Sequence, residues 1–197
     1  ESTSVHMAPG LSFTHDGEIP SQVAIAVDGD NLSPITDLSP EDAVFTGSLP
    51  TSLVYPLSPR PRALLLQPRG GLDVLTALHH DATSVVAVLD NPLVLEAVAD
   101  GSGSQASDIY SDPRVAVAVE GHRSYLRSTD EQFDVVQVSL ADSFRPVLAG
   151  AYSISESYLY TTEAFQEYYR RLAPDGFISV TRWIQLPPSE GIRTVSV

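Results

Sequence analysis

The sequence predicts an α/β fold with a mostly parallel sheet. From about residue 58 onward, short apolar runs typical of buried strands alternate with segments of helical periodicity. Pro, Gly and Asn residues stand between these segments, where turns and helix ends are expected. Such alternation makes right-handed crossovers, with helices on both faces of the sheet, the most economical arrangement.

Residues 1–57 differ in composition, being rich in Pro, Ser, Gly and Asp. The apolar alternation at 23–27 is followed by Asp28-Gly29, a turn signal typical of a β-hairpin. Two prolines in the segment 58–62 cannot continue a helix or a central strand. We therefore expect a small β-rich N-terminal region over 1–57 and an α/β domain over 58–197.

The first strand-helix pair of the α/β domain is expected between residues 63 and 79. Residues 63–67 form a continuous apolar run with the length of a buried strand. Gly70-Gly71 then opens a stretch in which leucines recur at helical spacing, at Leu72, Leu75 and Leu78.

A second pair follows directly. Residues 85–88 predict a buried strand, Asn91 is a good N-cap, and Pro92 suits the first helical position. This helix is expected to run to about residue 99, where Gly101 can stop it.

The C-terminal half continues the alternation. Strands are expected at 115–119 and 133–139, with a short helix at 124–127 between them. After a longer connection, Thr161 can cap a helix, and the turn at 174–176 leads into a last strand at 177–183.

Composition excludes several classes of function. The chain has no Cys, which removes disulfides and thiolate chemistry. Its formal net charge of −14 would repel nucleic acid and anionic lipid, so we expect no nucleic-acid partner. We expect a cytoplasmic, soluble domain, since no run approaches the roughly 20 apolar residues of a membrane span.

Eight short segments, taken in their order and spacing, resemble the spermidine and spermine synthases (polyamine aminopropyltransferases). The segments are RALLL at 62–66, GGLDVL at 70–75, VLDNP at 88–92, DPRV at 112–115, RSYLR at 123–127, FDVVQ at 133–137, LYTTEAF at 159–165 and LAPDG at 172–176. The resemblance is greatest to a divergent bacterial branch often fused to membrane segments. It implies a Rossmann-like fold of the class I methyltransferase type, and a parent protein that could be membrane-associated.

The resemblance also implies where the sheet should end. Folds of this class normally finish with two further strands, and few residues follow the last expected strand. We therefore expect those C-terminal strands to be missing and one sheet edge to be exposed. An N-terminal β region often mediates pairing in such enzymes, which makes a homodimer an expectation.

In this family a Gly-rich loop after the first strand approaches the nucleoside of decarboxylated S-adenosylmethionine, or of S-adenosylmethionine in related methyltransferases. Here the resemblance implies cofactor binding by Gly70 and Gly71, whereas Pro68 removes an amide donor and Arg69 adds bulk. The alternative is that the glycines only permit a tight turn from strand to helix.

The family's ribose-binding acid follows the second strand, and the matching position holds Leu89. Asp90 is one residue further, so it can replace that acid only if the strand end is bulged; otherwise it is a solvated strand end. After the third strand, the family's adenine-binding acid is replaced by Gly121. Glu120 or His122 could serve instead, with a surface turn as the alternative.

The fourth strand should carry the catalysis. Aminopropyl transfer requires a neutral amine, whose ordinary pKa is near that of Lys, about 10.4, so a carboxylate must accept its proton. The family uses two aspartates three residues apart, and the aligned positions are Ser139 and Asp142. The resemblance thus implies a catalytic role for Asp142, with Ser139 in place of the first acid.

Substrate binding is expected further along the chain. Glu156, Tyr158 and Tyr160 could line a groove for a polyamine, although aromatic residues at this spacing also pack against sheets. A hydrolase triad of Ser139, His122 and Asp142 is disfavoured because no G-x-S-x-G motif surrounds the serine.

No metal site is expected. His79 and His80 are adjacent, so on a helix their side chains diverge by about 100°, and no HExxH-like spacing exists.

Two functions remain open. One is aminopropyl transfer by a divergent enzyme, and the other is a catalytically inactive binding or assembly domain that keeps the fold. Methyl transfer from S-adenosylmethionine is a lesser alternative.

Overall fold

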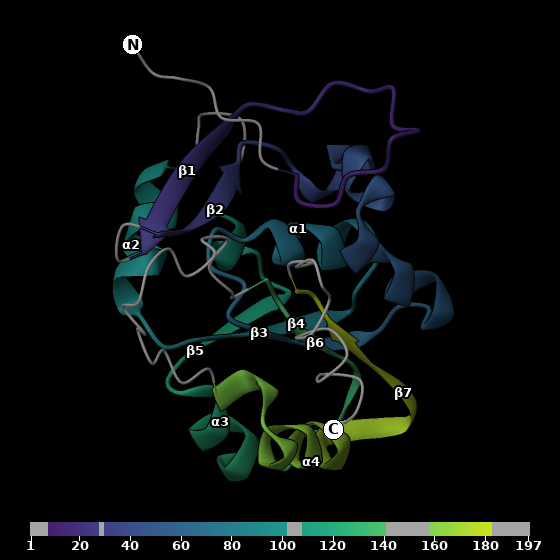
Figure 1. Cartoon of the computed structure of the whole chain (residues 1–197), viewed down its shortest axis with the longest axis vertical. Coiled ribbons are helices and arrows are strands. Elements are labelled where there is room, and N and C mark those ends of the chain that lie inside the picture. The colour runs from purple at the N-terminus through teal and green to yellow at the C-terminus, as the bar shows by residue number, and fades with distance from the viewer. Residues whose placement is uncertain (1–7, 28–29, 102–107, 141–157, 183–197) are drawn as a thin grey trace, which may run out of the picture.

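The computed structural model describes residues 8–27, 30–101, 108–140 and 158–182. A five-stranded sheet with strand order β5-β4-β3-β6-β7 forms its centre, and every pair of neighbouring strands is parallel (Figure 1). The strands are β3 (Arg62–Leu66), β4 (Ser84–Leu89), β5 (Val115–Val119), β6 (Phe133–Val138) and β7 (Leu172–Val180). The predicted α/β fold is confirmed.

Helices cover both faces of this sheet. In Figure 1, α1 (Leu72–His79) and α2 (Pro92–Gly101) lie on one side, and α3 (His122–Ser128) and α4 (Thr162–Arg171) on the other. Side chains of a strand alternate between these faces. Thus Ala63 and Leu65 of β3 join the apolar cluster with α1 and α2, whereas Leu64 and Leu66 join the cluster with α3 and α4.

Local signals placed two helix starts correctly. The Asn91 side-chain oxygen accepts a hydrogen bond of 3.0 Å from the backbone N–H of Leu93. The Thr161 hydroxyl oxygen accepts one of 3.2 Å from the N–H of Ala164. Each side chain satisfies a first-turn donor that the helix itself cannot pair.

The N-terminal region begins with the predicted hairpin, in which β1 (Gln22–Val27) pairs antiparallel with β2 (Asp30–Thr36). Three 3-10 helices follow the hairpin, at Pro40–Asp42, Val44–Ser48 and Pro50–Leu57. Two of these helices have a proline in their first turn. Proline suits this position because the N–H groups of the first turn have no acceptor within the helix, so its missing N–H costs no hydrogen bond.

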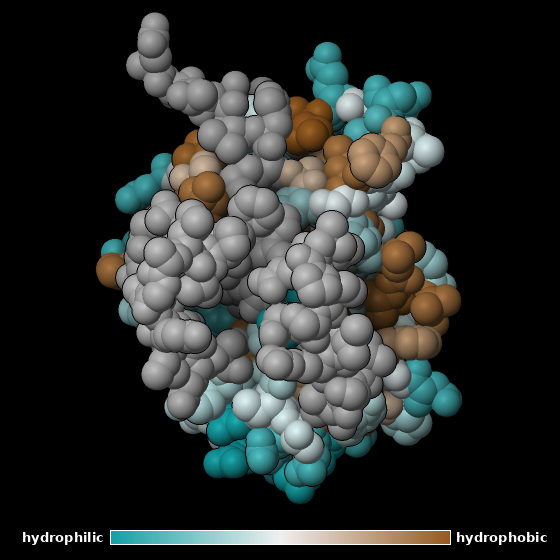
Figure 2. Space-filling model, viewed as in Figure 1, coloured by the Kyte–Doolittle hydropathy of each residue, from teal (hydrophilic) through white to brown (hydrophobic). Residues whose placement is uncertain are grey.

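The N-terminal region shares its core with the α/β domain. Ile35 of the hairpin, and Val54 and Tyr55 of the last 3-10 helix, belong to the same apolar cluster as α1 and α2. Val44, Leu53 and Leu57 of these 3-10 helices remain exposed. Figure 2 shows apolar surface on the right of the molecule, where Figure 1 places these helices. The boundary expected at residue 57 stays a prediction.

The last strand starts earlier than expected. Leu172 already pairs with Phe133, and Phe177 pairs with Val135, so the turn at 174–176 is accommodated as an irregularity within β7. Asp175 there has a φ of 62°. Among the described residues, β7 pairs with β6 alone.

Within the described ranges, none of the helices combines the length and the apolar character required to span a bilayer.

Candidate functional site

Most of the predicted site residues lie where the strands end at their carboxyl edge, which is the usual ligand-binding edge of such sheets. Gly70 and Gly71 follow β3, Asp90 follows β4, Glu120 and Gly121 follow β5, and Ser139 follows β6. Asp142 and Glu156 lie outside the described residues.

In the loop after β3, two residues other than glycine adopt the left-handed backbone conformation that glycine favours. Gln67 and Arg69 have φ values of 59° and 44°, and Gly71 has a φ of 89°. Left-handed backbone costs a residue other than glycine about 1–2 kcal/mol. The Tyr110 hydroxyl donates a hydrogen bond of 2.6 Å to the Arg69 carbonyl oxygen and holds the loop.

The two glycines of this loop contact the chain's own N-terminal hairpin and a 3-10 helix. A Cβ on Gly70 would lie 2.3 Å from the carbonyl oxygen of Pro34. A Cβ on Gly71 would lie 2.5 Å from Cγ2 of Ile109, in the 3-10 helix Ile109–Ser111. The Gly70 N–H also donates a hydrogen bond of 3.0 Å to the Ser33 hydroxyl oxygen. Protein atoms therefore occupy the space that the absent side chains leave.

The end of β4 is regular. Leu89 pairs in register with Val119, without a bulge at this end of the strand, and only 1% of its surface is exposed. Asp90 comes next and is exposed. A ribose placed beside Leu89 would meet an apolar core residue rather than a hydrogen-bond acceptor.

The residues predicted to lie near an adenine are found at the start of α3. Glu120 is half-buried and Gly121 is exposed, and a Cβ on Gly121 would meet no described atom within 4 Å. Burial lowers the pKa of His122, while a hydrogen bond with the backbone of Tyr158 and the charge of Asp90 act in the opposite direction.

Two arginines stack on the tyrosines that were expected to line a polyamine groove. The guanidinium carbon of Arg123 lies 5.1 Å from the centre of the Tyr158 ring, and that of Arg182 lies 4.1 Å from the centre of the Tyr160 ring. These positions are where an aromatic ring attracts a cation. Arg123 and Arg182 therefore each occupy one cation-binding position over a tyrosine ring.

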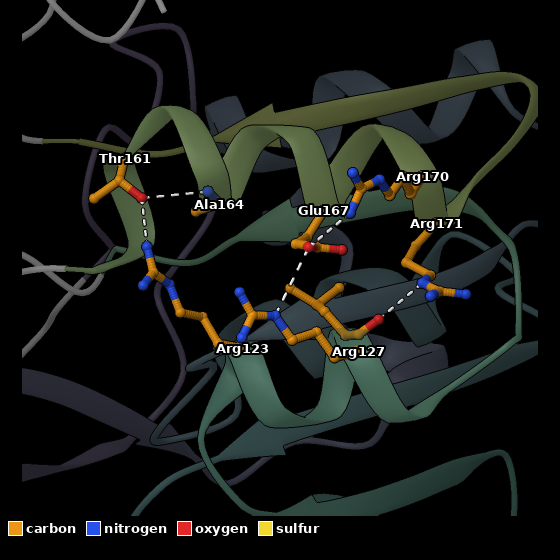
Figure 3. A network of polar contacts seen from close by, with 8 residues as sticks. Arg123, Arg127, Thr161, Ala164, Glu167, Arg170 and Arg171 are labelled. Atoms are coloured by element: carbon orange, nitrogen blue, oxygen red, sulfur yellow. Dashed lines mark hydrogen bonds and ion pairs between the residues drawn. The ribbon is translucent and has the colours of Figure 1, made fainter.

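The arginines of α3 and α4 mainly join the two helices (Figure 3). Arg123 donates a hydrogen bond of 2.7 Å to the Thr161 hydroxyl. Arg127 and Arg170 both approach Oε1 of Glu167, at 3.8 and 2.9 Å. Arg171 donates a hydrogen bond of 2.8 Å to the carbonyl oxygen of Leu126. We assign this network a structural role.

Asp73, a buried acid in the first turn of α1, is not among the site residues predicted from the sequence. It is 8% exposed, and Ser139, Gln137 and Thr51 are its polar neighbours. Burial raises the pKa of the Asp73 carboxyl above its ordinary value, and these neighbours offset part of the rise. Its one sequence signal is a lone acid among apolar residues, at 72–75.

Ser139 and Asp73 line one cavity of about 50 Å³ at the carboxyl ends of β3 and β6. A second gap of about 10 Å³ borders Gly70, Gly71 and Ile109. Ligand pockets for drug-sized molecules measure about 300–1,000 Å³. Among the described residues, no group of three or more His, Asp or Glu side chains is placed to hold a metal ion.

Comparison with known proteins supports the fold. A scan for known protein families finds no match, and no curated protein matches the sequence. Spermidine synthase from Thermotoga maritima matches with 21% identity over 76% of this chain and 48% of that chain, at a TM-score of 0.52. A spermidine synthase in complex with the transition-state analogue AdoDATO matches with 20% identity over 76% and 47%, at 0.51.

Human methyltransferase-like protein 13, in complex with SAH, matches with 18% identity over 65% of this chain and 56% of that chain, at a TM-score of 0.44. The chain spans about half the length of the spermidine synthases it matches. Its structure thus shares the α/β fold of the spermidine synthases at low sequence identity.

Proposed function

We propose that the chain is a binding or assembly domain that keeps the fold of the spermidine synthases without their aminopropyl transfer. One observation carries this proposal: the glycines expected to face an adenosyl cofactor pack against Pro34 and Ile109 of the same chain. A nucleoside would have to displace the hairpin in order to lie on Gly70.

The residues at the other cofactor positions support the same view. Leu89 is buried where the family requires an acid for the ribose hydroxyls, and Pro68 removes an amide donor from the loop. Losing the partner of a buried or bound polar group costs about 1–3 kcal/mol. These residues therefore do not fit an adenosyl group bound in the family's manner.

The amine side also lacks the family's chemistry. Ser139 stands where the first acid of the reaction is expected, and a serine hydroxyl is a poor base at neutral pH. The guanidinium groups over Tyr158 and Tyr160 would repel a polyamine from the stacked positions.

Calorimetric titration tests the proposal, using S-adenosylmethionine, its decarboxylated form and methylthioadenosine. We expect no binding of the three compounds and no transfer to putrescine or spermidine. Micromolar binding that Asp90→Ala weakens would instead establish a cofactor site at the end of β4. A homodimer stays a prediction, which light scattering of the same samples tests.

A second function has one observation in its favour. Asp73 is a buried acid beside Ser139, so the carboxylate missing from β6 has a counterpart on α1. Aminopropyl transfer would use Asp73 or Asp142 to accept the proton of the amine. Turnover with decarboxylated S-adenosylmethionine and putrescine, lost in either Asp73→Asn or Asp142→Asn, would support this alternative.

A further inference from the structure

The segment 43–59 contains no charged residue, although 18% of the chain is charged. It forms the 3-10 helices Val44–Ser48 and Pro50–Leu57, which contact each other and pack on α1. Asp42 precedes the segment and Arg60 follows it. Charged residues are depleted at the centre of protein–protein interfaces. The composition of this segment is therefore that of an interface core.

The two 3-10 helices are apolar on their inner and on their outer sides. Phe45 and Tyr55 are buried in the cores beneath, whereas Val44, Leu53 and Leu57 are 71%, 70% and 62% exposed. In Figure 2 apolar surface lies on the right of the molecule, where Figure 1 places these helices. A helix that is apolar all round is normally covered on all sides. The outer side is thus suited to a covering partner.

Other exposed apolar side chains, such as Val119 and Tyr169, stand beside charges. Val119 is followed by Glu120, and Tyr169 is followed by Arg170. Single apolar side chains of this kind are common on protein surfaces. The segment 43–59 differs because it exposes three large aliphatic side chains with no charge between them, which is typical of an interaction site.

The net charge of the chain bears on which partner this face fits. Two copies with a formal net charge of −14 repel each other, and the repulsion is least where the contacting surfaces carry no charge. A basic protein would instead be attracted to the acidic surface elsewhere on the chain. Membrane-binding helices normally carry Lys or Arg beside their apolar residues. An uncharged apolar face on an acidic chain therefore fits a second copy of the same chain.

We propose that Val44, Leu53 and Leu57 form the centre of a homodimer interface. In a two-fold symmetric dimer the same face of both protomers is in contact, so these side chains of one protomer pack on those of its partner. A substitution in this face enters the interface twice, once from each protomer. The inference rests on the proposed function in that it names the partner of an assembly domain, and it requires association but no reaction.

Sedimentation equilibrium of the full chain tests the interface. The native chain is a dimer, and Leu53→Glu weakens it by roughly 100-fold or more, because the burial of two leucines is lost and two charges enter the interface. Leu93→Glu is the matched control, since it adds the same charge at an exposed leucine of α2 and leaves the dimer intact. Circular dichroism verifies folding, and Leu57→Glu replaces Leu53→Glu if that variant does not fold.

Salt gives an independent readout. Raising NaCl from about 0.05 to about 0.5 M screens the repulsion between the two acidic copies, so the dimer dissociation constant falls. A dimer that dissociates at high salt would be held by ion pairs instead, and would overturn the proposal.

Three further results would overturn it. They are a native chain that stays monomeric, equal effects of Leu53→Glu and Leu93→Glu, and flotation with phosphatidylcholine vesicles that Leu53→Glu abolishes. The last result would assign this face to lipid. Binding of S-adenosylmethionine in the calorimetric titration would contradict the proposed function, while the sedimentation result would still decide the interface.

Discussion

The α-carbon of Gly70 lies so close to the carbonyl oxygen of Pro34 that a Cβ would come within 2.3 Å of that oxygen. The hairpin thus packs directly on the strand-to-helix loop of the α/β domain. The N–H of Gly70 is bonded to Ser33 of the same hairpin, so the glycine serves packing within the chain.

This contact predicts that Gly70→Ala destabilises the fold. The added methyl group would meet backbone atoms, which cannot move away as a flexible side chain can. We expect a loss of about 2–3 kcal/mol in the free energy of unfolding, measured by urea denaturation. Gly121→Ala is the matched control: it meets open space at a φ of −62°, and should change stability by less than about 1 kcal/mol. Equal effects of the two substitutions would contradict the packing.

The left-handed backbone of Arg69 predicts an unusual order of stability. At a φ of 44°, glycine relieves strain whereas alanine retains it. Arg69→Gly should therefore be more stable than Arg69→Ala by about 1 kcal/mol, the reverse of the order in ordinary helix or strand positions. Thermal unfolding of the two variants measures the difference, and a less stable glycine variant would refute the loop conformation.

Much of the fold is predictable because its signals are local. The caps at Asn91 and Thr161, and the apolar run of β3, depend on a few neighbouring residues and were found from sequence. The 3-10 helices and the irregular start of β7 depend on packing between distant segments, and were not. The pairing of β3 with β6 brings Asp73 next to Ser139, residues far apart in the sequence, so no local pattern identifies their cavity.

Asp73 predicts a specific dependence of stability on pH. Because its pKa is raised in the folded state, the folded protein holds this proton more tightly than the unfolded chain. The contribution of Asp73 is therefore most favourable below the unfolded pKa of about 3.9, and is lost as pH rises through the folded value. Asp73→Asn should gain stability relative to the native chain as pH increases from about 4 to 7. Urea denaturation of both proteins across this range measures the difference, and a constant difference would contradict a buried acid.

Asp112 should behave in the opposite way. Hydrogen bonds from Arg114, at 2.8 and 2.9 Å, lower the pKa of the Asp112 carboxyl. Its contribution is present above the unfolded pKa and is lost as pH falls through the lower, folded value. Asp112→Asn should thus be less stable than the native chain at neutral pH, and the difference should shrink in acid. A difference that grows on acidification would exclude this ion pair in solution.

Amide NMR of the loop at 67–71 tests the central claim most directly. Isotope-labelled protein is titrated with S-adenosylmethionine and with methylthioadenosine, and the N–H signals of Gly70 and Gly71 are followed. We predict that both signals stay in place, because the hairpin and Ile109 already fill the space beside these glycines. Saturable shifts of both signals would mean that a nucleoside reaches the loop. That result would contradict the proposal that the domain keeps the fold but does not bind the cofactor.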